Sequence, residues 1–154
     1  MSEELVQELL NARLIASLAT LNDGGSIHLV AMWFLWEGNA ILIPTSGATR
    51  KIRNLERDAR ATVMIDDSRG GFDLRGITVV GSAEIVRGKA ARELNRPIHL
   101  KYVTEEGLSQ GPVQAYLATD DVTVCVRPER VSSWDLRSTE QCRALGAGLY
   151  RPLE

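Results

Sequence analysis

Cysteine is scarce in this sequence, and the pattern of the two that occur excludes two classes of protein. Cys125 and Cys142 provide neither a disulfide framework nor a metal-binding spacing, and they suit a reducing compartment. Residues 1–10 are acidic and amphipathic rather than basic and then apolar, unlike a signal peptide, and no apolar run approaches membrane-spanning length. We therefore expect a cytoplasmic protein that does not enter a membrane.

An excess of charge of one sign is also lacking. The net charge is −2 at pH 7, which gives no general attraction to nucleic acid or to an anionic membrane. With 154 residues, 44% of them hydrophobic and 25% charged, the chain is long enough for a single domain, residues 1–154, with a real core. Basic groups can therefore matter only locally.

Familiar catalytic motifs are absent from the sequence. It contains no G-x-S-x-G nucleophile elbow, no G-x-x-x-x-G-K-[ST] phosphate loop, no G-x-G-x-x-G after a strand and no H-E-x-x-H. The two histidines, His28 and His99, are far apart and have no cysteine or carboxylate at metal-ligand spacing, which argues against a zinc site built by the protein. If the protein is an enzyme, we expect a bound cofactor to supply the chemistry.

What the sequence does contain is a series of strand patterns separated by turn residues. Apolar or alternating segments predict about seven strands, at residues 14–20, 26–36, 40–44, 60–66, 74–86, 122–126 and 131–135. Residues 127–130 are predicted as the turn before the last strand. Strands joined mostly by tight turns favour a closed or nearly closed antiparallel barrel.

Helical spacing occurs in three segments that would be insertions in this barrel. These are residues 3–13, 49–58 and 87–102, and Pro97 should kink or split the last of them. Residues 104–118 are typical of a loop that holds at most one short helix. The fold class is therefore mainly β, with helices at the periphery.

The second predicted strand ends in large apolar residues, at 32–36, without polar alternation. A strand of this kind is covered on both faces. The barrel core would cover one face, and either a second subunit or a flat aromatic ligand would cover the other. A contact between two copies of the chain is therefore expected.

Residues 44–55 form the candidate ligand site. A hydrophobic strand ends at Pro44 and is followed by hydroxyl groups, a glycine and a helix whose first turns carry Arg50, Lys51 and Arg53. Cations at a helix N-terminus are at its electrostatically unfavourable end, each at a cost of a few tenths to about 1 kcal/mol. A bound phosphate would explain why cations, hydroxyls and free backbone N–H groups gather there. The alternative is a solvated basic turn on a surface helix.

Four segments in order along the chain resemble the pyridoxamine 5′-phosphate oxidase-like split β-barrel family, including its flavin- and deazaflavin-dependent branch. The second segment, Thr-Arg-Lys-Ile-Arg-Asn-Leu followed by Arg-Asp-Ala-Arg, is similar to the family's phosphate-binding helix, usually K-x-x-N-L followed by R-D-P-R. The resemblance covers residues 9–137, leaves a tail at 138–154, and implies a split antiparallel β-barrel of six to seven strands with peripheral helices. The four segments are residues 16–34, 49–60, 75–84 and 130–135.

The resemblance implies a homodimer that holds two cofactors in clefts between its subunits. The cofactor would be FMN or 8-hydroxy-5-deazaflavin (coenzyme F-420). By position, Lys51, with Thr49 and Arg50, would hold the cofactor phosphate. Thr45 and Ser46 would lie near the ribityl chain.

Further residues are assigned to the ring system by the same resemblance. Trp33 and the strand end at Pro44 would border the ring, and Trp134 would approach it from the partner subunit. Arg75 lies beside a predicted bend, where it is either a second anion contact or a charge at the edge of the sheet. No side chain stands out as a general acid or base.

Two departures from the family pattern bear on activity. Ala59 replaces the usual proline of the phosphate-binding segment, and the last segment lacks the Arg-x-His substrate motif of true pyridoxamine phosphate oxidases, which argues against vitamin B6 oxidation. We expect an oxidoreductase in which the bound cofactor transfers a hydride to or from a small molecule. A protein that binds or stores flavin or haem without turnover is the alternative, and a purely structural dimeric barrel is a third.

Overall fold

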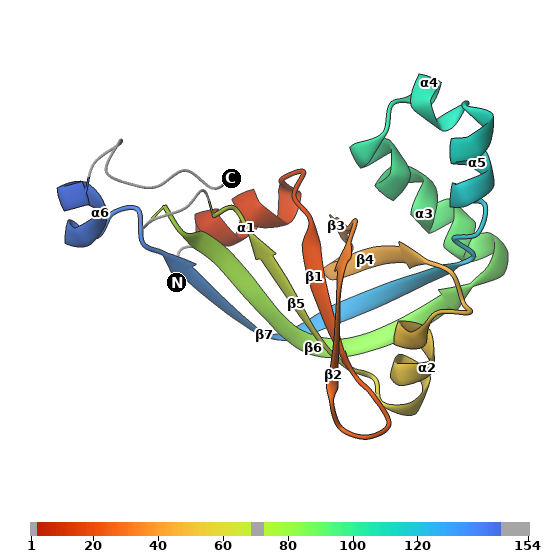
Figure 1. Ribbon diagram of the computed structural model, residues 1–154, viewed down its shortest axis with the longest axis horizontal. Coiled ribbons are helices and arrows are strands. Elements are labelled where there is room, and N and C mark those ends of the chain that lie inside the picture. The colour runs from red at the N-terminus through yellow and green to blue at the C-terminus, as the bar shows by residue number, and fades with distance from the viewer. Residues whose placement is uncertain (1–2, 69–72, 146–154) are drawn as a thin grey trace.

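Seven strands of the described residues form one antiparallel sheet. The first two strands of the chain lie at one edge of this sheet, and the third and fourth lie at the other edge. The computed structural model describes residues 3–68 and 73–145, and the strand order in this part of the chain is β2-β1-β5-β6-β7-β4-β3 (Figure 1). The strands are β1 (Ala16–Leu21), β2 (Ile27–Met32), β3 (Leu35–Glu37), β4 (Ala40–Thr45), β5 (Arg60–Asp66), β6 (Arg75–Arg87) and β7 (Val122–Asp135).

Six helices of the described residues lie around this sheet. In Figure 1, α3, α4 and α5 gather on one side beside β4, whereas α1 lies over the other part of the sheet and α2 follows β4 directly. The fold is therefore α+β, a split antiparallel β-barrel with peripheral helices, which confirms the sequence prediction. The helices are α1 (Glu3–Asn11), α2 (Arg50–Arg57), α3 (Gly88–Tyr102), α4 (Glu105–Leu108), α5 (Gly111–Leu117) and α6 (Glu140–Leu145).

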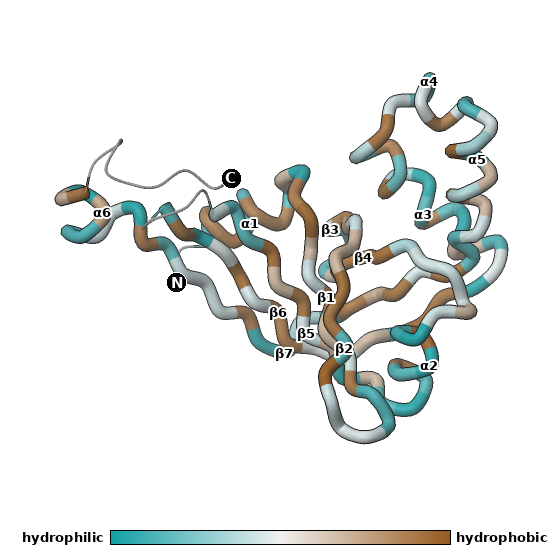
Figure 2. Tube along the Cα trace, viewed as in Figure 1, coloured by the Kyte–Doolittle hydropathy of each residue, from teal (hydrophilic) through white to brown (hydrophobic). Residues whose placement is uncertain are grey.

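The core lies between the inward faces of the strands and one stripe of α1. Burial alternates along β1 and β5, as expected for strands with one face in a core. Hydrophobic residues, brown in Figure 2, accordingly run along several strands of the sheet and along part of α1. The stripe of α1 is buried as its helical spacing predicts, and its residues are Leu5, Val6, Leu9 and Leu10.

The second predicted strand, at residues 26–36, is wrong in one respect, because the structure divides it into β2 and β3. β2 pairs with β1 and β3 pairs with β4, and these pairings lie at opposite edges of the sheet. The chain must leave one edge before it joins the other. Phe34, between the two strands, is fully buried, and its backbone N–H and C=O both lie 3.3 Å from the Tyr102 hydroxyl.

The turn predicted at residues 127–130 is also wrong, because β7 runs through it as one strand from Val122 to Asp135. The register between β6 and β7 shifts between Val80 and Gly81, and Gly81 lies opposite Pro128. Proline cannot donate to a strand ladder and is accommodated at a bulge. A Cβ at Gly81 would lie 2.0 Å from the Arg127 carbonyl oxygen, so this bulge requires glycine.

For the segment between β6 and β7, the structure decides one alternative of the prediction and corrects a second point. Pro97 does not split α3, which is one helix over Gly88–Tyr102. Proline frees the carbonyl four residues earlier, and Glu93 is exposed, so water can satisfy that group. Residues 104–118 contain two short helices, α4 and α5, where at most one was expected.

Candidate functional site

A cavity of about 580 Å³ lies where β2, the end of β4, the start of α2 and the α5–β7 connection meet. Small-molecule sites in proteins typically have volumes of about 300–1,000 Å³. The cavity brings together six of the residues that the sequence assigned to a cofactor. Its lining consists of Val30, Ala31, Met32, Trp33, Pro44, Thr45, Ser46, Thr49, Lys51, Tyr116, Leu117, Thr119 and Asp120.

Lys51 is the buried cation of this cavity. The residue is 7% exposed, and its Nζ donates a hydrogen bond to Thr45 Oγ1 at 3.0 Å. Burial lowers the pKa of Lys51, and the nearby carboxylate of Asp120 partly opposes this effect. An ammonium group has three N–H donors, and within the described residues only one of these donors has an acceptor. An anion entering the cavity would satisfy the others.

The N-terminus of α2 lies at the same cavity without a side-chain cap. Thr49 is at the N-cap position in an extended conformation, with φ −80° and ψ 158°. Its hydroxyl does not accept from the first turn of α2 but donates to the Ser46 carbonyl oxygen, at 2.9 Å. The backbone N–H groups at the start of a helix carry partial positive charge and bind anions well. Both features therefore fit a phosphate group.

The turn before α2 is held in place by the segment that precedes β7. The Gly47 N–H donates to Asp121 Oδ1 at 2.8 Å. A Cβ at Gly47 would approach Arg87 at 3.1 Å and Val122 at 3.2 Å, so the turn packs closely against these residues. The pairing of Thr45 with Val122 in the β4–β7 ladder brings the two segments together.

Trp33 forms an aromatic wall of the cavity with support from α3. Its ring stacks on Tyr102 with a centroid distance of 5.0 Å and an interplanar angle of 4°, and meets the His99 ring edge-on at 6.3 Å. The Tyr102 hydroxyl donates to the Leu14 carbonyl oxygen at 2.6 Å. The Tyr102 and His99 rings thus hold the orientation of the Trp33 ring.

Asp120 is a charged residue of the cavity that sequence reasoning did not assign to the site. Asp120 Oδ2 lies 3.1 Å from His99 Nε2, and both side chains are largely buried. Asn95 fixes the same residue by donating to its backbone carbonyl oxygen at 3.0 Å. No local spacing signals this group, because α3 and the α5–β7 connection supply its parts.

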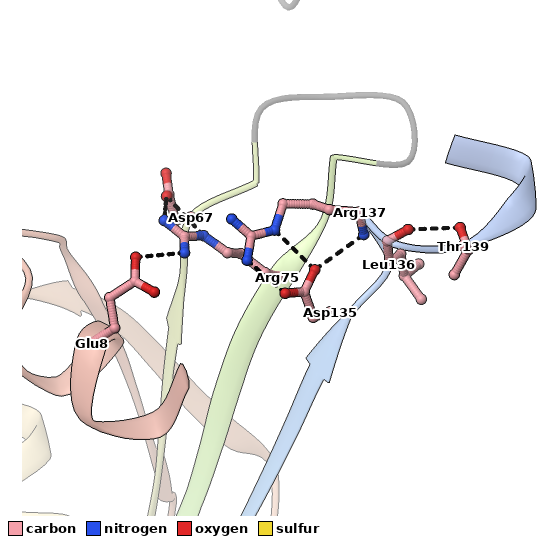
Figure 3. A network of polar contacts seen from close by, with 7 residues as sticks. All are labelled: Glu8, Asp67, Arg75, Asp135, Leu136, Arg137 and Thr139. Atoms are coloured by element: carbon pink, nitrogen blue, oxygen red, sulfur yellow. Dashed lines mark hydrogen bonds and ion pairs between the residues drawn. The ribbon is translucent and has the colours of Figure 1, made fainter. Parts of the chain in front are cut away.

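Three of the predicted site residues lie outside the cavity. Arg50 is exposed, and Trp134 lies on β7 opposite Gly76 of β6, where a Cβ on Gly76 would be 2.3 Å from the indole ring. Arg75 belongs to an ion-pair network at the end of the β6–β7 ribbon (Figure 3), with Glu8 at 2.6 Å and Asp67 at 2.5 Å. These pairs raise the pKa of Arg75 and occupy its guanidinium within this chain.

In residues 3–68 and 73–145, no three His, Cys, Asp or Glu side chains gather in a way that could hold a metal ion. Over the same part of the chain, no helix has both the length and the apolar character needed to cross a bilayer.

The fold and the cavity define a split-barrel protein with a pocket of small-molecule size. The family model described as pyridoxamine 5′-phosphate oxidase matches residues 2–135, and the chain therefore belongs to this family. The resemblance inferred from the four sequence segments is thus confirmed. No curated protein matches the chain.

Solved structures similar to this chain include proteins of several descriptions. The conserved hypothetical protein Rv2991 from Mycobacterium tuberculosis is 28% identical, with a TM-score of 0.73 over 89% of this chain and 86% of its own. A protein described as an F420 reductase is 25% identical, with a TM-score of 0.67 over 82% of this chain and 94% of its own. An FAD-binding protein from Mesorhizobium loti, 18% identical with a TM-score of 0.64 over 86% and 94%, shares the fold.

Proposed function

We propose that the protein is an oxidoreductase that binds FMN or 8-hydroxy-5-deazaflavin in the 580 Å³ cavity and transfers a hydride between this cofactor and a small molecule. The observation that carries the proposal is the buried ammonium of Lys51 beside the uncapped N-terminus of α2. A desolvated cation without an acidic partner in hydrogen-bond contact is costly in a folded protein. A cofactor phosphate would offset that cost.

The chain's own residues would bind and orient the cofactor rather than react with the substrate. Lys51 and the first N–H groups of α2 hold the phosphate, while the hydroxyls of Thr45 and Ser46 line the path from the phosphate into the cavity. Trp33, fixed by its stacking on Tyr102, gives a flat apolar surface for the ring. The bound cofactor supplies the hydride chemistry.

The choice between the two cofactors rests on relatives. The protein described as an F420 reductase is 25% identical to this chain and covers most of it, which supports the deazaflavin. The family match supports FMN to the same degree, because the matching family model is described as pyridoxamine 5′-phosphate oxidase. Both cofactors present a phosphate and a flat ring system, so one site can serve either of them.

The proposal includes a homodimer, because the cavity is continuous with an exposed apolar face of the sheet. Ile27 and Leu29 on the edge strand β2 are 69% and 64% exposed, and Met64 of β5 is 38% exposed. Ala31, the next outward residue of β2, lines the cavity itself. A second copy that covered this face would also close the cavity, and it could bring a residue such as its own Trp134 to the ring.

The test is titration of the purified protein with FMN and with coenzyme F-420, for wild type, Lys51→Ala and the matched control Lys89→Ala. Lys89 is 91% exposed on α3 and pairs with Glu93 at 3.8 Å. We expect Lys51→Ala to lose about tenfold or more in affinity, because a charge-assisted hydrogen bond contributes about 1.5–3 kcal/mol. Equal affinity of the three proteins would refute the phosphate site.

Turnover separates an oxidoreductase from a protein that only stores its cofactor. The reduced cofactor, bound to wild type, is mixed with a panel of enones, quinones and tetrapyrrole acceptors, and its oxidation is followed by absorbance. We expect at least one acceptor to be reduced faster than in the protein-free reaction. Binding without any oxidation would contradict the enzyme proposal and favour a storage role.

A further inference from the structure

A second cavity, of about 310 Å³, lies between α3 and the α4–α5 hairpin, and it carries a different chemistry from the first. We propose that this cavity binds a carboxylate group of the substrate. That the ligand is a substrate rests on the proposed function, whereas the carboxylate site itself does not. The residues that carry the argument are Arg92, Arg96, His99, Gln114, Leu117 and Asp120.

The basic side chains come from one face of α3. Arg92, Arg96 and His99 have the spacing i, i+4 and i+7, which places them along a single helix face, and all three line the cavity. Arg92 makes no ion pair within the described residues, and the pair of Arg96 with Glu105 is long, at 3.6 Å, and exposed. Such a surface pair contributes little and is readily exchanged for a ligand anion.

The polar groups at the inner end of the cavity are already paired. Asn95 donates to the carbonyl oxygens of Asp120 and Val122 and accepts from the Thr123 hydroxyl, so it shapes the cavity without offering a free group. His99 is held against Asp120 at 3.1 Å. The donors open to a ligand are therefore the two guanidinium groups and the Gln114 amide.

The charge balance favours a singly charged group over a phosphate dianion. Two arginines face the cavity, but Asp120 lines it as well and Glu105 lies beside Arg96, so the local excess of positive charge is small. A guanidinium offers parallel N–H donors that match the two oxygens of a carboxylate. Gln114 adds a neutral donor.

The position of this cavity links it to the first. Leu117 and Asp120 line both cavities, so the two are separated by a shared wall that these side chains form. A substrate anchored by its carboxylate at Arg92 and Arg96 would thus lie directly beside the cofactor cavity. The site would select acidic substrates over neutral analogues of the same shape.

The test is calorimetric titration of the whole chain with glutarate, without added cofactor, for wild type, Arg92→Gln/Arg96→Gln and the control Lys89→Gln on the same helix. We expect the double variant to bind glutarate about tenfold more weakly, because two charge-assisted contacts are lost, and the control to match wild type. Lys51→Ala should bind glutarate as wild type does. Equal affinity in the double variant, loss of glutarate binding in Lys51→Ala, or tighter binding of inorganic phosphate than of glutarate by Lys51→Ala would each overturn the inference.

A cofactor titration of the same proteins tests the proposed function separately from the carboxylate site. We expect the double variant to bind FMN or coenzyme F-420 as wild type does, while Lys51→Ala does not. If no protein bound a cofactor but glutarate binding still depended on the two arginines, the carboxylate site would stand and the oxidoreductase proposal would fail. Loss of cofactor binding in the double variant would instead contradict the separation of the two cavities.

Discussion

Lys101, near the end of α3, gives the clearest quantitative prediction from the structure. Its Nζ is buried and has no hydrogen-bond partner within the described residues, and it lies 3.9 Å from the centroid of the Phe34 ring. Burial lowers the pKa of Lys101 from 10.5 to about 8. The charged form is thus penalised in the folded state, and replacing the residue by methionine should remove that penalty.

The magnitude follows from linkage between protonation and folding. A pKa of about 8 in place of 10.5 corresponds to about 3 kcal/mol at most, and partial solvent screening reduces this to about 1–2 kcal/mol. The variant also loses a cation–π contact of about 0.5–1 kcal/mol. We therefore expect Lys101→Met to raise the free energy of unfolding by about 1 kcal/mol at neutral pH.

The sign of the pH dependence provides a second check. Between about pH 8 and about pH 10.5 the unfolded chain keeps the proton on Lys101 and the folded chain releases it, so the contribution of this residue to wild-type stability rises with pH. The difference between variant and wild type should therefore shrink from neutral pH to about pH 10. Urea denaturation at both pH values measures it, with Lys89→Met as the exposed control. The reasoning would be refuted if the difference in the free energy of unfolding between variant and wild type grew with pH, or if the variant were less stable than wild type at neutral pH.

Two other predictions concern the sheet. Gly76→Ala should lower the free energy of unfolding by about 2 kcal/mol or more, because the new Cβ would lie 2.3 Å from the Trp134 ring, whereas Gly24→Ala, which meets nothing within 4 Å, should have a much smaller effect. Thermal denaturation compares them, and equal melting temperatures would be inconsistent with the packing described. Light scattering should give wild type twice the mass of one chain, and Leu29→Glu, with a charge on the exposed face of β2, the mass of one chain. A wild-type monomer would contradict the homodimer.

Local patterns were sufficient for much of this structure. The strand, turn and helix that span β4 and α2 were predicted because each depends on near neighbours: apolar residues, then hydroxyls and a glycine, then helical spacing. Thr45 and Lys51, which the sequence assigned to the cofactor, lie together in the structure. They are six residues apart in sequence and are joined by a hydrogen bond. Their role toward a cofactor stays a prediction until a cofactor is titrated.

Features that depend on distant partners could not be predicted in this way. Apolar residues continue from β2 into β3, and the break appears only because β2 and β3 pair at opposite edges of the sheet. Pro128 is normally a turn signal, but Gly81, far away in sequence, lets it sit in a bulge. Asp120 joins the cavity because pairing of Thr45 with Val122 fixes the end of the α5–β7 connection there.

The most direct measurement of the central claim compares cofactors with and without their phosphate on the wild-type protein. The dissociation constants of FMN and riboflavin are measured, together with those of coenzyme F-420 and its phosphate-free deazariboflavin core. If Lys51 and the N-terminus of α2 hold the phosphate, the phosphorylated member of at least one pair should bind about 100-fold more tightly. Affinities within about threefold in both pairs would contradict the account, because the phosphate would then gain nothing from the buried lysine.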